Sequence, residues 1–208
     1  MHNLLIKANA FFDISLSGKS RIAIILASAF LLPTLLLPLW TMTLTSNQFP
    51  EGLVLKIYAH KLEGAKTPNR DDLKEINALN HYIGMRPLQE EDFTEFKWIP
   101  FVIGGTVLLA LRAVVLGKMS KLVDLIVLFT YFGLFSLWSF YNKLSLYGHD
   151  LDPTAAVKVE PFMPPMFGHR TMANFEVYSY PSTGSAFMVL VVVLLVAAVW
   201  LSRREGRA

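Results

Sequence analysis

The sequence contains no cysteine. This absence excludes disulfide bonds, thiolate zinc sites, cysteine-ligated iron–sulfur clusters and cysteine nucleophiles. Charged residues are also scarce, because they make up 17% of the 208 residues, whereas soluble domains carry about 25%. With 53% hydrophobic residues the chain is too apolar for an ordinary soluble domain. We therefore attribute its net charge of +3 to membrane topology and expect no nucleic-acid partner.

The motifs of the common enzyme classes are missing as well. The sequence has no Walker loop, no glycine-rich dinucleotide fingerprint, and no H-E-x-x-H, G-x-S-x-G or C-x-x-C-H motif. An enzyme acting alone is the least favoured class. We predict a non-catalytic protein and assign no catalytic residue.

Long apolar runs are abundant, and each of four runs is long enough to cross a bilayer as a helix. They cover residues 21–42, 98–117, 122–141 and 185–202. The first run can also be read as a signal peptide, but no clean cleavage site follows it, so we expect a retained anchor. Pro33 and Pro38 lie inside this run and are expected to kink the helix. The fold class predicted from these runs is an all-α polytopic membrane protein.

Basic residues gather on one side of the predicted spans, and this side should be cytoplasmic. They are Lys7, Lys19, Arg21, Lys118, Lys121, Arg203, Arg204 and Arg207. The cytoplasmic segments are then 1–20, 118–121 and 203–208. The two long connections, 43–97 and 142–184, are acidic and should lie outside and pack together.

The first long connection contains a short helix near residues 70–84. Asn69 or Asp71 can cap its start, and Gly84 followed by Pro87 should end it. Before it, "LVLKIYAHKL" alternates in part and indicates one strand. Asn77 and His81 share a helix face, so His81 is either hydrogen-bonded by Asn77 or available as a metal ligand.

The second long connection is rich in proline and methionine. Its "MPPM" segment should be extended and stiff, and we expect "PFMPPMFG" to contact the 70–84 helix or to share one partner surface with it. Imidazole and thioether ligands suit Cu(I). The candidate copper ligands are His81, Met85, Met163, Met166 and His169. The competing interpretation is that the methionines fill gaps in a packed interface.

The strings "INALNHYIGMRPL" (76–88), "GHDLDP" (148–153) and "VEPFMPPMFGHRTMANF" (159–175) resemble segments of a family of small bacterial membrane proteins. That family is associated with copper-enzyme gene neighbourhoods, notably those for nitrous oxide reductase maturation. The resemblance covers the two long connections. It directs attention to eight residues that we assign to partner docking: Asn77, Asn80, Gly84, His149, Pro164, Pro165, Gly168 and Asn174.

Together these features lead us to expect an accessory subunit or docking partner of a larger bacterial membrane enzyme complex, copper-dependent or respiratory. The alternative is a protein that binds and delivers copper for the maturation of a periplasmic or membrane cuproenzyme. In both cases the expected location is the bacterial cytoplasmic membrane, with the long connections on the periplasmic side. The expected partners are the lipid bilayer and other membrane subunits, and copper is the expected cofactor if there is one.

Overall fold

The computed structural model describes residues 6, 9–172 and 174–205, so Lys7 and Arg207, which entered the orientation argument, lie outside the described residues. The chain divides into two compact units. Unit 1 comprises Met1–Leu35, Pro100–Leu134 and Ala186–Ala208, and unit 2 comprises Leu36–Ile99 and Phe135–Ser185.

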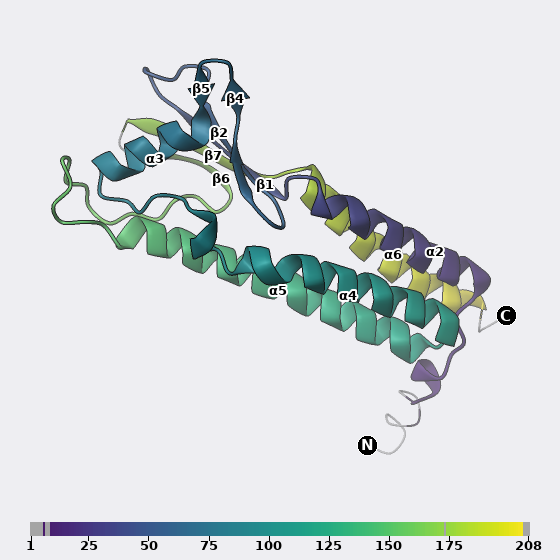
Figure 1. The fold of residues 1–208 in the computed structure, drawn as a ribbon. Coiled ribbons are helices and arrows are strands. Elements are labelled where there is room, and N and C mark those ends of the chain that lie inside the picture. The colour runs from purple at the N-terminus through teal and green to yellow at the C-terminus, as the bar shows by residue number, and fades with distance from the viewer. Residues whose placement is uncertain (1–5, 7–8, 173, 206–208) are drawn as a thin grey trace. The chain divides into compact units, whose positions relative to one another are not determined.

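Four helical segments are long and apolar enough to cross a membrane (Figure 1). They are Gly18–Leu35, which contains α2 (Gly18–Leu31) and η1 (Leu32–Leu35), α4 (Glu95–Leu116), α5 (Met119–His149) and α6 (Thr183–Glu205). The predicted all-α fold class is nevertheless wrong. Unit 2 contains a five-stranded antiparallel sheet, so the chain is a mixed α/β protein.

The first helix is shorter than the predicted span over residues 21–42. It ends at Leu31 and continues as the 3-10 turn η1, because Pro33 has no N–H to donate within a helix. The hydroxyl of Thr34 donates to the Leu31 carbonyl at 2.6 Å and so satisfies one free group at the helix end. The chain then becomes extended, and Trp40–Thr45 forms strand β1 rather than a membrane helix.

The helices α2 and α6 of unit 1 lie side by side and are joined by hydroxyl groups (Figure 1). Ser20 donates to the Ala198 carbonyl at 2.7 Å, and Ser202 donates to the Ser20 hydroxyl, also at 2.7 Å. Both serines are buried.

The segments predicted to be cytoplasmic meet within unit 1. The amide of Leu16 donates to the Gly117 carbonyl at 2.7 Å, which places the N-terminal segment against the turn between α4 and α5. Lys19 forms an ion pair with Glu205 near the end of α6 at 3.4 Å. This convergence agrees with a single basic end of the helices. Which side of a membrane that end faces remains a prediction.

The sheet of unit 2 joins strands from both long connections in the order β3-β2-β1-β7-β6. The strands are β1 (Trp40–Thr45), β2 (Leu53–Ile57), β3 (Leu62–Gly64), β6 (Gly168–Met172) and β7 (Phe175–Pro181), and a separate pair is formed by β4 (Lys66–Thr67) and β5 (Arg70–Asp71). The segment predicted as one strand, 53–62, is the hairpin β2–β3. In the centre of the sheet Met42 pairs with Ser179.

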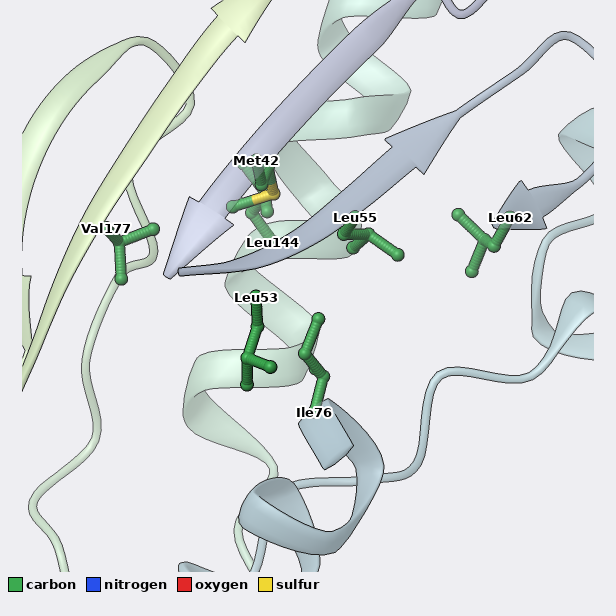
Figure 2. Packing of buried hydrophobic residues seen from close by; sticks show 7 residues of the cluster. All are labelled: Met42, Leu53, Leu55, Leu62, Ile76, Leu144 and Val177. Carbon is green, nitrogen blue, oxygen red and sulfur yellow. The ribbon is translucent and has the colours of Figure 1, made fainter. Parts of the chain in front are cut away.

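The two faces of the sheet differ because side chains alternate along each strand. One face carries buried apolar side chains such as Met42, Leu55 and Val177 (Figure 2). These pack with Ile76 of α3 (Asp72–Tyr82) and Leu144 of α5. We call this side the core face. The opposite side, which we call the outer face, carries more polar and aromatic residues from the alternate positions.

Candidate functional site

The two long connections contact each other where α3 ends. The amide of Asp152 donates to the Gly84 carbonyl at 2.8 Å, and the amide of Val157 donates to the Tyr82 carbonyl at 3.0 Å. Gly84 has a φ of 78°, and a Cβ atom there would lie 2.7 Å from the Asp152 carbonyl oxygen. The turn therefore requires glycine both for its backbone conformation and for the close approach of the second connection.

Asn77 binds the backbone of Leu88 rather than His81. Leu88 donates its amide to Asn77 Oδ1 at 2.7 Å, and Asn77 Nδ2 donates to the Leu88 carbonyl at 3.2 Å. Asn80 is buried, and its backbone carbonyl accepts from the Met85 amide at 2.8 Å. These two asparagines hold the chain that follows α3, so the expected Asn77–His81 hydrogen bond is not formed.

The proline-rich segment lies directly against the end of α5. Phe162 donates its amide to the Gly148 carbonyl at 2.9 Å, and a Cβ atom on Gly148 would lie 1.9 Å from the Phe162 carbonyl oxygen. Pro164 and Pro165 are buried. His149 is exposed and donates Nδ1 to the Ser145 carbonyl at 2.8 Å.

Of the eight residues assigned to docking, seven fall into two groups, and the eighth, His149, is exposed at the end of α5. Asn77, Asn80, Gly84, Pro164 and Pro165 contact other parts of unit 2, and the buried ones among them offer no surface to a partner. Gly168 and Asn174 form the second group and lie in the hairpin of β6 and β7. Gly168 is the first residue of β6, and Asn174 is exposed in the turn. Among the residues assigned to docking, this hairpin and His149 therefore remain accessible to a partner.

The five candidate copper ligands lie in three places. His81 is exposed on α3 and lines a cavity of about 660 Å3 together with Met85. Met163 and Met166 pack against the core of the sheet. His169 pairs with Tyr178 across β6 and β7, and their rings are tilted by 31° with centroids 4.6 Å apart.

His81 and Met85 thus share one cavity, whereas Met163, Met166 and His169 are not among the residues that line it. Within the described ranges, no three His, Asp or Glu side chains are placed to hold a metal ion.

Polar groups around the cavity beside His81 are already paired. Arg86 forms an ion pair with Asp150 at 2.7 Å. The side chain of Asp152 accepts from the hydroxyl and the amide of Thr154 at 2.6 and 2.8 Å, and these hydrogen bonds lower the pKa of Asp152. This turn is consequently well ordered without a ligand.

A larger cavity of about 760 Å3 lies on the core face of the sheet. The core face, α3, the end of α5 and the proline-rich segment all contribute to its lining. The lining is mostly apolar and includes Met42, Leu55, Ile76, Leu79, Leu144 and Val177. The helix near residues 70–84, which α3 forms, was predicted from the sequence. The cavity was not, because it requires the long-range pairing of β1 with β7.

This cavity is partly open to solvent, and its apolar side chains offer water few hydrogen-bond partners. Its lining therefore suits an apolar ligand better than water.

Two cations border the larger cavity and differ in their pairing. Lys143 donates Nζ to the Asp92 carbonyl and lies 3.9 Å from the Glu95 carboxylate, so its charge is compensated. Arg170 donates Nη1 to the Met163 carbonyl at 3.1 Å, and no acidic side chain of the described residues lies within ion-pair distance of it. Arg170 is exposed.

Aromatic rings mark the other side of the sheet and its edge. The rings of Phe167 and Tyr180 form an edge-to-face pair with centroids 5.4 Å apart, and His169 and Tyr178 form the second pair. Phe167 is 66% exposed and Tyr180 is 45% exposed. We call these four residues the aromatic patch.

Comparison of the chain with family models, with curated proteins and with solved structures finds no match. The functional argument therefore rests on the geometry of the two units and on the residues themselves.

Proposed function

We propose that the chain is a non-catalytic accessory subunit that docks onto a larger membrane enzyme through the aromatic patch. The observation that carries this proposal is the exposure of Phe167 and Tyr180 as a preformed ring pair on unit 2. Aromatic side chains are enriched in protein interfaces, where a few of them supply most of the binding energy. Rings that already contact each other also lose little conformational freedom when they bind.

The surroundings of the aromatic patch support the same proposal. β6 is an edge strand of the sheet and pairs with β7 on one side. Gly168 and Asn174, two of the residues that the resemblance singled out, belong to this hairpin. Exposed aromatic residues beside a sheet edge offer a partner both apolar contact and main-chain hydrogen bonds.

The setting of this docking role follows from the sequence. In this proposal the four candidate spans anchor the chain in a membrane, with the basic end in the cytoplasm and the long connections outside, as the positive-inside rule predicts. The resemblance to membrane proteins from copper-enzyme gene neighbourhoods points to a bacterial inner membrane and to a copper-dependent or respiratory enzyme as the partner.

The test combines Phe167→Ala with Tyr180→Ala in the full chain. Each truncation of an interface anchor costs about 2 kcal/mol, so the complex should dissociate and the chain should migrate alone in native gels of solubilised membranes. Tyr141→Ala is the matched control, because Tyr141 is an equally exposed aromatic residue of unit 2 outside the aromatic patch. A photo-crosslinker at position 180 should attach a subunit of the enzyme. An undiminished complex in the double variant would rule out the patch.

A copper-delivery role is the second candidate, favoured by one observation. His81 and Met85 line the same cavity, and imidazole with thioether suits Cu(I). In this role the two residues would hold the ion outside the membrane before its transfer to a cuproenzyme. The test is Cu(I) binding to the purified chain, measured by competition with a chromogenic chelator. The double variant His81→Ala with Met85→Ala should lose the ion while His149→Ala keeps it. Equal binding by all three chains would reject the role.

A further inference from the structure

We propose that the 760 Å3 cavity on the core face binds one long acyl chain, whose acidic head group is held by Arg170. The head group is a phosphate or a carboxylate, supplied by a phospholipid or by a fatty acid. This inference goes beyond the docking role, because it concerns the cavity side of the sheet and does not depend on the aromatic patch.

The lining of the cavity matches a hydrocarbon chain. Its volume falls within the roughly 300–1,000 Å3 of typical ligand sites, which are mostly apolar with a few polar groups that orient the ligand. Leu79 of α3, Leu144 of α5 and Phe175 of β7 present apolar side chains from three different elements. Such a lining offers dispersion contacts to methylene groups and few hydrogen bonds to water.

The helix α5 connects a candidate membrane span with the wall of the cavity, which gives a lipid a source close to the site. This helix is a candidate membrane span, and the same continuous helix carries Phe140, Leu144 and Tyr147 into the cavity wall. The predicted span ended at residue 141, so these residues lie within two turns of the expected lipid head groups. An acyl amphiphile is the most abundant apolar molecule at that level.

The charges around the cavity select the position of the head group. A guanidinium has five N–H donors in a planar fork that matches a carboxylate or a phosphate. Arg170 uses one of them on the Met163 carbonyl, which leaves donors for an anion. Lys143 is compensated by Glu95, and Glu160 brings a negative charge to the lining. An acidic head group is therefore attracted to Arg170 and repelled by Glu160.

The first experiment labels the full chain in native membranes with a photoreactive diazirine fatty acid. Peptides covering residues 159–164 and 170–177, which line the cavity and lie outside the four candidate spans, should carry the label. Excess unlabelled fatty acid or phosphatidylglycerol should abolish this labelling. Label confined to the candidate spans, or labelling that no competitor reduces, would overturn the proposal.

The second experiment counts the amphiphiles retained by the purified chain by native mass spectrometry, and the mass separates fatty acid from phospholipid. Leu144→Trp fills the cavity, whereas Leu146→Trp makes the same change at an exposed position of α5 outside the cavity. The first variant should retain about tenfold less ligand than the wild type, and the second should be unchanged.

Arg170→Gln adds the test of the head group. Loss of a charged hydrogen-bond donor should weaken retention of acidic amphiphiles about tenfold. Retention of zwitterionic phospholipids should fall less, because the cation of their own head group already offsets the charge of the phosphate. Equal ligand retention by the wild type and by Leu144→Trp would mean that the retained lipids surround the helices and do not occupy the cavity. An unchanged preference of Arg170→Gln for acidic amphiphiles would rule out Arg170 as the head-group site. If Leu144→Trp does not fold, the labelling of the wild-type chain still decides the proposal.

Discussion

Arg70 donates Nε to the carboxylate of Asp72 at 2.7 Å, and the Asp72 side chain is only 1% exposed. The same carboxylate accepts from the Val54 amide at 2.8 Å, and Arg70 also donates to the Gly52 carbonyl at 3.2 Å. One buried ion pair thus joins the start of β2 to the first turn of α3. Its acidic member also lies at the helix N-terminus, where a negative charge is stabilising.

Asp72→Ala should therefore destabilise unit 2 by about 3 kcal/mol, because it leaves Arg70 and the Val54 amide without their shared acceptor. Asp71→Ala is the matched control, since it removes the N-cap hydrogen bond to Leu73 and a long, solvent-exposed ion pair with Lys66, and should cost about 1 kcal/mol. Hydrogen exchange of β2 and α3 in the solubilised protein measures both effects. Similar losses in the two variants would contradict the special role of Asp72.

Gly148→Ala should release the proline-rich segment from α5. The added methyl group would occupy the position of the Phe162 carbonyl, so the two backbones must separate. Gly133→Ala lies on the same helix with nothing within 4 Å of the new Cβ, and it should be neutral or stabilising by up to about 1 kcal/mol. Limited proteolysis should cut residues 159–165 faster only in the first variant.

Ser202→Ala should weaken the pairing of α2 with α6 by about 1 kcal/mol, because hydrogen bonds between helices in lipid are worth about that amount. Ser28→Ala provides the comparison. Its hydroxyl is also buried, but it donates to the Ile24 carbonyl of its own helix. Steric trapping of the unfolded state in bicelles would measure the difference, and a larger loss for Ser28→Ala would speak against the interhelical bond.

The orientation can be tested cleanly because the chain has no cysteine of its own. A membrane-impermeant maleimide added outside should label Thr67→Cys and Asn174→Cys, both of which are exposed. Lys118→Cys should react only after the membrane is opened. The reverse pattern would place unit 2 in the cytoplasm and would remove the periplasmic setting from the proposed function.

The number of helices long and apolar enough to cross a membrane could be predicted from the sequence, because a 20-residue apolar run is a local signal. The predicted end of the first helix, residue 42, was wrong for a specific reason. "WTMTLT" after Pro38 is apolar enough to extend a hydropathy window, yet its threonines and tryptophan favour a strand. The proline that was expected to kink the helix ends it instead.

The five-stranded sheet and the cavity could not be predicted from local sequence patterns, because both depend on pairing between strands that are far apart in the sequence. Strand β1 pairs with β7, so Trp40 lies opposite Pro181, and no periodicity within either segment reveals that partner. Met163 and Met166 illustrate the consequence for the candidate site. Their spacing suggested soft ligands, but once the sheet forms they pack against its core, as methionines often do.

The pairing of Asn77 with Leu88 makes the fold sensitive to the ageing of a single amide group. Asn77 presents one acceptor and one donor to the Leu88 backbone, as a neighbouring strand would. Spontaneous hydrolysis of that amide, which changes one nitrogen into oxygen, would set a carboxylate oxygen against the Leu88 carbonyl with no proton between them. Two acceptors would then face each other, and the segment after α3 would lose its attachment without any change in side-chain size. The lifetime of the chain in an intact conformation can thus depend on the chemical durability of one asparagine.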